Sequence, residues 1–351
     1  RLAGVGRRVE ALAVSQEAVD LYRELAAGSR DAYLPDLAMS VNNHANRLAG
    51  VGRRVEALAV SQEAVDLYRE LAAGSRDAHL PDLAMSVNNH ALRLAQAGRH
   101  AEALAVSQEA VDLNRELAAG SRDAYLPDLA TSVNNHAVRL AQAGRCVEAL
   151  AASQEAVDLR RELAAGSRDA YLPNLATSVN NHAATLAQVG RRVEALGASQ
   201  EAVDLYRELA AGNRDAHLPD LATSLNNHAL RLAQAGRRDK ALAASQEAID
   251  LYRELAAGNR DAYLPDLATS LWNVGYVARI LGETSEQILD AVAEGVGYFD
   301  ELAATEPQAF TARREAAAYT LTALQRSAVN QHPTLTPPRS PRADEAAPDT
   351  A

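Results

Sequence analysis

The sequence predicts an all-α protein built as a solenoid of antiparallel helix hairpins. A 46-residue segment recurs without insertion, so that residues 1–46 reappear at 47–92 with only two changes. Every full period carries two glycines at the spacing of helix ends. Aromatic residues make up only 4% of the chain, which indicates a core of small aliphatic side chains at close approach. A fixed period of this length is typical of stacked helical repeats.

Each period is expected to contain two helices. The first opens at a Leu-Pro-Asp step such as residues 80–82, because proline fits the first helical position and an acid there favours the helix dipole. It runs to Gly98, which can adopt the left-handed conformation that ends a helix. The second helix runs from near Arg99 to Gly120, a second stop. Residues 121–126 then lead to the next proline.

The apolar residues of one period define three faces. At 100° per residue the first helix carries one narrow apolar stripe, whereas the second helix is apolar on two sides. A single hairpin buries only one of those sides, so neighbouring hairpins must stack. The stripes are Leu83, Val87, Ala91 and Leu94 in the first helix, and Ala103, Ser107, Ala110 and Leu117 beside Leu104, Val111 and Ala118 in the second.

The segment at 88–110 resembles the tetratricopeptide repeat, or TPR. Its small, large and turn positions are matched by Ala91, Leu94, Gly98, Ala103 and Ala110. The resemblance covers residues 1–304, but the period is 46 residues instead of the family's 34. Long helices of this kind look like the kinesin-light-chain-like TPRs of bacterial signalling proteins. The resemblance implies a right-handed superhelical solenoid of about six full hairpins, with a leading half-repeat and a C-terminal cap, whose first helices line a concave groove.

The two ends of the chain differ from its centre. The chain begins at Arg1, which is not a methionine, within what later copies use as the last turn of a first helix, so we expect a fragment of a longer protein with an exposed apolar edge. After residue 270 the repeat diverges, as capping units do. We expect the solenoid over 1–304, a capping helix over 305–328 and a disordered Pro-rich tail over 329–351.

Composition excludes several classes of function. A net charge of −11 argues against a general nucleic-acid binder, and the single cysteine, Cys146, excludes a disulfide framework within the chain. No apolar run is long enough to span a membrane, and no signal peptide opens the chain. A cytoplasmic location is therefore expected. We find no P-loop, no dinucleotide-binding glycine pattern and no acid pair in contrasting environments, so neither an enzyme nor a cofactor is expected.

One histidine recurs in each period, at His44, His90, His136, His182 and His228. Equivalent residues of neighbouring repeats lie about 8–10 Å apart, whereas zinc needs its ligands at about 2 Å. The helical angle places each histidine near the middle of the buried stripe. We therefore expect neutral, hydrogen-bonded core histidines and no metal, and we expect acid to destabilise the array.

Two asparagines precede each of these histidines. They lie more than 100° from the buried stripe of the first helix, where a row of amides can bind the backbone of an extended peptide. The alternative is that the amides bridge or cap neighbouring helices. Apolar outer positions beside them would tune specificity. The candidate residues are Asn42, Asn43, Asn88, Asn89, Asn134, Asn135, Asn180, Asn181, Asn226 and Asn227, with Leu92, Val138 and Leu230.

The charged residues suggest no further site. Chaperone-binding TPRs hold a terminal carboxylate with a basic clamp, but the corresponding groove positions here, such as Gln96 and Gln142, are neutral. Pairs such as Arg53-Arg54 favour a basic ridge or, because acids accompany them, a solvated face with i,i+4 pairing.

Three functions remain open. The first is a non-catalytic scaffold that binds a peptide segment or a partner domain in the groove. The second is a regulatory or sensor arm of a larger NTPase or protease signalling protein, whose catalytic domain would lie upstream of Arg1. The third is self-association through the N-terminal edge. A protein or peptide partner is expected, and neither nucleic acid nor a membrane.

Overall fold

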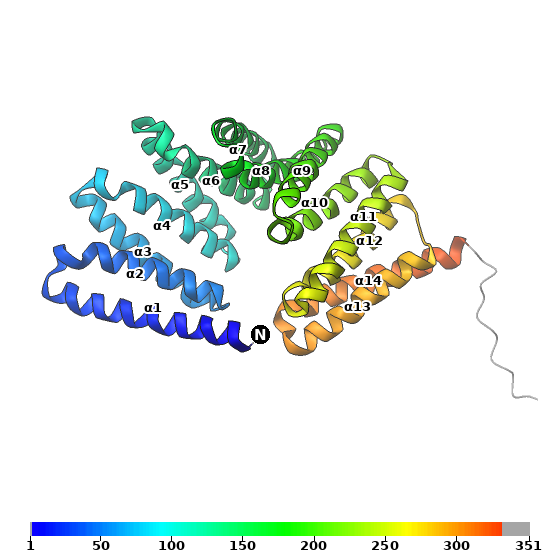
Figure 1. The fold of residues 1–351 in the computed structure, drawn as a ribbon, viewed down its shortest axis with the longest axis horizontal. Coiled ribbons are helices and arrows are strands. Elements are labelled where there is room, and N and C mark those ends of the chain that lie inside the picture. Colours follow the sequence, from blue (N-terminus) through cyan, green and yellow to red (C-terminus); the bar gives the residue numbers. More distant parts are fainter. Residues whose placement is uncertain (1, 332–351) are drawn as a thin grey trace, which may run out of the picture. The chain divides into compact units, whose positions relative to one another are not determined.

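The computed structural model describes residues 2–331, which form fourteen α-helices and no β-strand. Figure 1 shows their order along the chain. The helices are α1 (Leu2–Gly28), α2 (Arg30–Gly50), α3 (Arg54–Gly74), α4 (Arg76–Gln96), α5 (His100–Gly120), α6 (Arg122–Gln142), α7 (Cys146–Gly166), α8 (Arg168–Gln188), α9 (Arg192–Gly212), α10 (Arg214–Gln234), α11 (Arg238–Gly258), α12 (Arg260–Leu281), α13 (Glu286–Thr305) and α14 (Pro307–Gln331).

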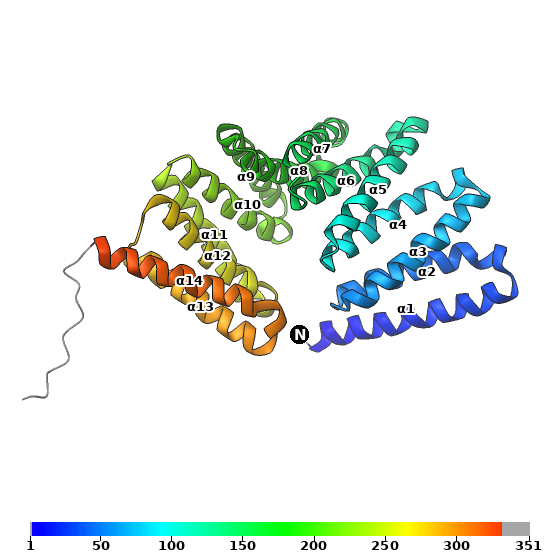
Figure 2. The same cartoon turned by 180° about the vertical axis from the view of Figure 1, so that it is seen from behind.

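The helices group into two compact units, Arg1–Ala235 and Gly236–Ala351, called unit 1 and unit 2 below. Unit 1 contains α1 to α10, and each helix from α1 to α9 packs against the next one along the chain. Figures 1 and 2 show this succession from both sides. In unit 2, α12 packs on α11, α13 on α12 and α14 on α13. The predicted all-α repeat solenoid is therefore confirmed.

Small side chains form the core of unit 1. Ala38, Ala64 and Ala84 are at most 1% exposed, and Val41 and Val87 are fully buried beside them. Small residues at these contacts let helices approach closely, while each buried leucine of the same stripes contributes about 1.5–3 kcal/mol. The narrow stripe predicted for the first helices is thus the stripe that the structure buries.

The left-handed turn predicted at Gly98 is present and is repeated in every hairpin. Gly98 has φ of +77°, and the glycines at positions 52, 144, 190, 236 and 282 have φ between +70° and +81°. The N–H of Arg99 donates to the carbonyl of Leu94 at 2.9 Å, which closes the end of α4. A side chain at these positions would meet a strained backbone.

The other boundary was predicted wrongly. The link between hairpins is a single residue such as Ser75, with φ −148° and ψ 90°, and α4 begins at Arg76. Pro81 therefore lies inside the helix and not at its first position. The helix tolerates the proline because the carbonyl left without a donor belongs to Asp77, whose residue is exposed to water in the first turn. The break between α3 and α4 comes from the extended backbone of Ser75.

The first helix also differs from expectation. α1 is continuous from Leu2 to Gly28, although residues 1–8 repeat the sequence that ends α2 and begins α3. At the later turn, Arg53 donates to the carbonyl of Leu48, whose side chain is anchored in the core at 2% exposure. Gly6 lies inside α1, so the same eight residues form a turn in one copy and continuous helix in the other. α1 is thus a leading second helix.

Aromatic side chains replace the repeat pattern in unit 2. Trp272 stands at an asparagine position of the repeat; its ring meets that of Phe299 edge-on at 6.3 Å, and its Nε1 donates to Thr320 Oγ1 of α14 at 3.0 Å. Phe299 is fully buried. α14 ends at Gln331, and the remainder of the segment expected to be disordered, residues 332–351, lies outside the described residues. Within residues 2–331, no helix is both apolar and long enough to cross a membrane.

Candidate binding face of the even-numbered helices

The even-numbered helices of unit 1 lie on the inner side of its curved stack. Across one intervening helix, α4 approaches α6, α6 approaches α8 and α8 approaches α10 with Cα atoms within 8 Å. No two odd-numbered helices of the described chain approach as extensively. Since successive even-numbered helices lie closer together than successive odd-numbered helices, the side formed by the even-numbered helices is concave. We call the exposed surface of α2, α4, α6, α8 and α10 the inner face.

Asparagine side chains connect these helices in an amide ladder. The second asparagine of each pair donates from Nδ2 to Oδ1 of the first asparagine in the preceding even-numbered helix. The four rungs are Asn89 to Asn42 at 3.5 Å, Asn135 to Asn88 at 3.1 Å, Asn181 to Asn134 at 3.3 Å and Asn227 to Asn180 at 3.2 Å. The bridging alternative for these residues is therefore realised in the structure.

The ladder uses only part of each amide. Every rung takes one N–H and one lone pair, while an amide offers two N–H groups and two lone pairs. The asparagines are half-buried from Asn88 onward, and Asn43 is exposed, but Asn42 is only 4% exposed. The expectation that all ten lie far from the buried surface was thus too simple, because the neighbouring even-numbered helix covers one edge of them.

Apolar side chains lie beside the ladder. Leu92 is 37% exposed, and Val138 and Leu230 are half-buried at the equivalent position. Sequence reasoning missed Met39 and Met85, which are 50% and 47% exposed one turn before the ladder. The available signal was the change of residue type at this repeat position, which is methionine in the first two copies and threonine in later ones such as Thr131 and Thr177. The inner face therefore mixes amides with apolar groups.

A row of arginines follows the ladder toward the C-terminal ends of the even-numbered helices. Each is half-buried and donates from Nη1 to the Oε1 of a glutamine three residues later: Arg93 to Gln96 at 2.9 Å, Arg139 to Gln142 at 2.8 Å and Arg231 to Gln234 at 2.9 Å. Arg93 also donates to Asn46 of α2 at 2.9 Å. Burial lowers the pKa of all three guanidinium groups. Sequence reasoning missed these arginines because it considered only the neighbouring groove positions, which are neutral glutamines.

The arginines of the outer helices behave differently, because they pair with acids. Salt bridges join Arg23 to Glu63 at 2.7 Å and three equivalent pairs at 2.9 Å, namely Arg69–Glu109, Arg115–Glu155 and Arg161–Glu201. The turn arginines pair three residues along, as Arg53 does with Glu56. The expected i,i+4 pattern was wrong for these arginines. In the outer helices, ion pairs between repeats replace it, because stacking brings equivalent faces together; at the turns, pairs three residues apart replace it.

The repeated histidine is buried and hydrogen-bonded, as predicted. Ser61 Oγ on α3 lies 2.8 Å from Nδ1 of His90 on α4, and the same contact joins Ser15 to His44. Since Ser61 donates its only hydrogen to the carbonyl of Leu58, its oxygen accepts from Nδ1–H of a neutral imidazole. Burial lowers the pKa of His44, His90, His136 and His182. Among residues 10–330 no group of His, Cys, Asp and Glu could hold a metal ion.

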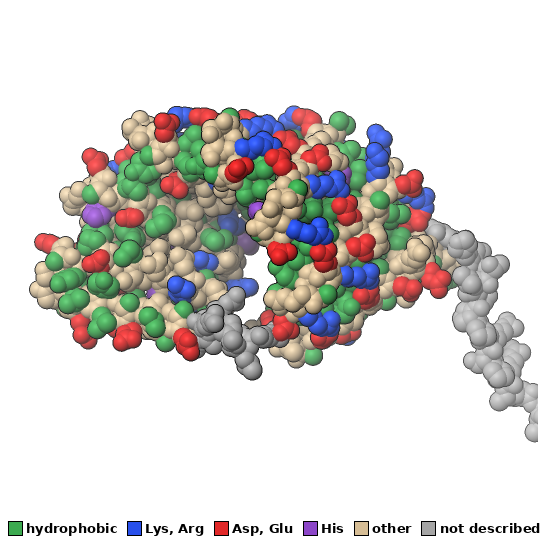
Figure 3. Space-filling model, viewed as in Figure 1, with side chains coloured by type: hydrophobic (Ala, Val, Ile, Leu, Met, Phe, Trp, Pro, Cys, Tyr) green, Lys and Arg blue, Asp and Glu red, His purple; other side chains and the backbone are tan. Residues whose placement is uncertain are grey.

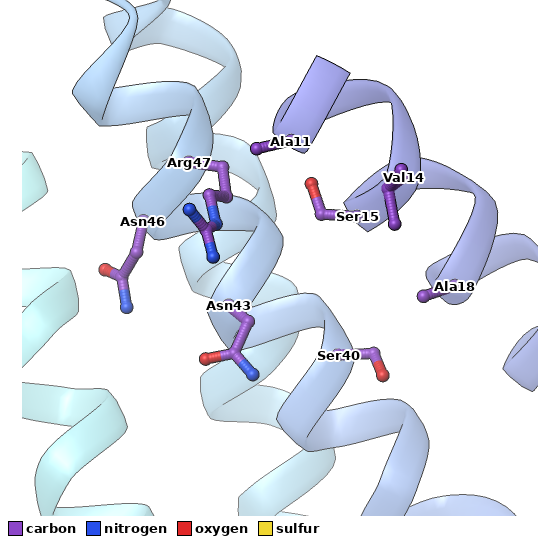
Figure 4. A pocket seen from close by; sticks show the side chains of 8 residues that line it. All are labelled: Ala11, Val14, Ser15, Ala18, Ser40, Asn43, Asn46 and Arg47. Atoms are coloured by element: carbon purple, nitrogen blue, oxygen red, sulfur yellow. The ribbon is translucent and has the colours of Figure 1, made fainter. Parts of the chain in front are cut away.

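A cavity lies between α1 and α2 at the start of the inner face. Figure 4 shows it from close by: Val14 and Ser15 come from α1, and Asn43, Asn46 and Arg47 from α2. Arg47, which is exposed, occupies the same position of α2 as Arg93 does of α4. Exposed apolar side chains also lie on α1, where Val14 is 64% and Leu21 is 55% exposed. The space-filling view shows apolar side chains among acidic ones over α1 to α4 (Figure 3).

The fold and this face define a helical-repeat solenoid protein. Residues 221–256 match the model of the tetratricopeptide repeat family, and the preceding periods carry the same sequence pattern, which supports a TPR-type repeat protein. No curated protein matches the chain.

Solved structures resemble the fold. The crystal structure of BtubC (BKLC) from P. vanneervenii is 17% identical with a TM-score of 0.51, over 84% of this chain and 97% of that one. A putative kinesin light chain from Podosopora anserina with nearly identical TPR-like repeats is 19% identical, with a TM-score of 0.48 over 63% and 96%.

Proposed function

We propose that the protein is a non-catalytic interaction scaffold that binds a peptide segment or a partner domain on its inner face. The observation that carries this proposal is the amide ladder, whose four rungs each use one N–H group and one lone pair of the amides and lie beside exposed apolar side chains. An extended chain that crosses the even-numbered helices would meet a new amide pair at each helix. Backbone hydrogen bonds would then give affinity, and the apolar positions specificity.

The ladder itself is a poor place to test binding, because changing an asparagine also removes a bridge between helices. The apolar positions separate the two roles. Leu92→Ser, Val138→Ser and Leu230→Ser together change the inner face and leave every rung intact. The matched control is Val55→Ser, Val147→Ser and Val193→Ser, at positions that are 80–85% exposed outside that face.

The assay is selection of binders from a displayed library of random peptides by the full chain. We expect enriched peptides to lose binding to the inner-face triple variant and to keep binding to the control triple variant, with both variants folded by circular dichroism. Enriched peptides that bind both variants equally well would contradict the proposal.

The alternative role, as a regulatory arm of a larger NTPase or protease, stays a prediction that depends on the sequence upstream of Arg1. Self-association through the face of α1 also stays a prediction. Light scattering over a concentration series tests it, and a mass that stays that of one chain would contradict it.

A further inference from the structure

Three half-buried arginines of unit 1 point to the chemistry of the partner. Arg93, Arg139 and Arg231 occupy the same position of α4, α6 and α10, three residues before the glutamine that holds each of them. The equivalent position of α8 is Thr185, which is buried and donates to the carbonyl of Asn181 at 3.1 Å. We call the three residues the arginine row. It runs parallel to the amide ladder and has one gap.

No carboxylate within the described residues forms a salt bridge with the arginine row, although acids exceed bases in this chain. The contrast is with Arg69, Arg115 and Arg161 on the outer helices, each of which pairs with a glutamate 40 residues further along. On the inner face the nearest equivalent acids of the same helices, such as Asp82, lie eleven residues before the arginine. Eleven residues of helix are about 16 Å, too far for a salt bridge.

The surroundings of the row favour an incoming anion. Half-buried guanidinium groups have lost part of their hydration without gaining a counter-charge, and Arg93 Nε is buried without a hydrogen-bond partner. The glutamines fix the guanidinium planes, so less conformational entropy remains to be lost when a carboxylate binds. Carboxylate and guanidinium form two parallel, charge-assisted hydrogen bonds, which are about twice as strong as neutral ones.

We propose that the inner face binds an extended acidic polypeptide whose side-chain carboxylates pair with Arg93, Arg139 and Arg231. This inference rests on the proposed scaffold function and names the partner's chemistry. Helices packed side by side lie about 8–10 Å apart, and an extended chain advances about 3.3 Å per residue. One repeat therefore corresponds to about three residues of the partner. The partner therefore carries two acids about three residues apart, which pair with Arg93 and Arg139. A third acid, which pairs with Arg231, follows about six residues later because the row has a gap at Thr185.

The test uses the full chain and fluorescent peptides with blocked termini. The acidic probe carries glutamates at the spacing above, the neutral probe has glutamine at the same places, and a third probe has its three glutamates adjacent. We expect the acidic probe to bind at least about tenfold more tightly than either of the others, with an affinity that falls as salt rises.

Two triple variants with equal loss of charge locate the site. Arg93→Gln, Arg139→Gln and Arg231→Gln should weaken the acidic probe at least about tenfold. Arg69→Gln, Arg115→Gln and Arg161→Gln, on the outer helices, should leave its affinity within about twofold. Thr185→Arg fills the gap, and it should tighten a probe that carries a fourth glutamate midway between the last two.

Other results overturn the inference. Equal weakening in both triple variants would mean attraction to net charge only. If the neutral probe binds as tightly as the acidic one, and loses binding in the Leu92, Val138 and Leu230 variant alone, then the proposed scaffold stands and the acidic partner is wrong. If library selection yields no binder of the inner face at all, the proposed function itself fails.

Discussion

Replacing Arg160 with tyrosine should stabilise the protein. Arg160 lies on α7 with only 4% of its surface exposed, and its Nη2 donates one hydrogen bond to Thr131 Oγ1 on α6 at 2.5 Å. Its Nε is buried without a partner, and burial lowers the pKa of the group despite the favourable charge of Asp128. A buried arginine without a carboxylate partner is a costly element of a core.

The repeat supplies the reference state for this substitution. Two helices further on, Tyr206 fills the equivalent position at 5% exposure, and its hydroxyl lies 2.9 Å from Thr177 Oγ1, the equivalent of Thr131. Arg160→Tyr therefore places a phenol where the fold already accommodates one. A buried donor without a partner costs about 1–3 kcal/mol, so the free energy of unfolding should rise by about that amount.

The assay is urea denaturation together with native-state hydrogen exchange. Stacked repeats need not unfold as one unit, so protection of the amides in α6 and α7 should report the gain locally. Arg160→Lys retains the charge and should bring no gain, whereas Tyr206→Arg should lose a similar amount in α8 and α9. If Arg160→Tyr left the stability of α6 and α7 unchanged while Tyr206→Arg was tolerated, the cost assigned to the buried guanidinium would be refuted.

Further substitutions and conditions probe the repeat. The unfolded chain binds more protons at its histidines than the folded one, because folding lowers their pKa, so stability should be full above pH 6.5 and fall below it, by at most about 1.4 kcal/mol per histidine at pH 5.5. Denaturation at pH 7.5 and 5.5 measures this fall, and His136→Val, which copies Val274 of the last repeat, should reduce it; an unchanged stability would contradict buried neutral imidazoles. Gly98→Ala should cost about 1–2 kcal/mol because φ is +77°, whereas Gly197→Ala, inside α9 with open space around it, should gain about 0.5–1 kcal/mol; equal effects in thermal melts would contradict the argument. Asn135→Ala removes one rung of the ladder and should cost about 0.5–1.5 kcal/mol, visible as faster hydrogen exchange in α4 and α6; no change would mean that the rungs do not bind the helices together.

Most of the fold was predictable because its determinants are local and are repeated. The apolar stripe of Leu83, Val87 and Leu94 follows from helical geometry alone, and Gly98 has the conformation that only its residue type adopts easily. The helix starts were missed because a proline can stand at several positions in the first turns of a helix. The position of Pro81 therefore does not fix where α4 begins, and the extended backbone of Ser75 does. The continuous α1 was missed because residues 1–8 have the same sequence as residues 47–54, which contain a turn.

The candidate site was predictable only in part, because its contacts join residues about one repeat apart. Asparagines on an outer surface were visible in the sequence, but the pairing of Asn135 with Asn88 depends on the closer spacing of the even-numbered helices. Arg93 was overlooked because charge pairing had been sought along one helix. Stacking satisfies the outer arginines with glutamates 40 residues away and offers none to the inner row.

Near-identical repeats make each departure from the pattern informative. Positions that pack in every copy, such as Ala64 and Ala110, are the same throughout, since one geometry has to recur. Departures at buried positions, such as Arg160, carry a cost that the neighbouring copies measure directly. Departures on the inner face, from Leu92 to Ala184 or from Arg139 to Thr185, disturb no rung of the ladder and change only what a partner meets. The outer helices vary between copies too, as at Arg160, but variation on the inner face changes the surface that a partner would meet there, which is a further reason to test binding on that face.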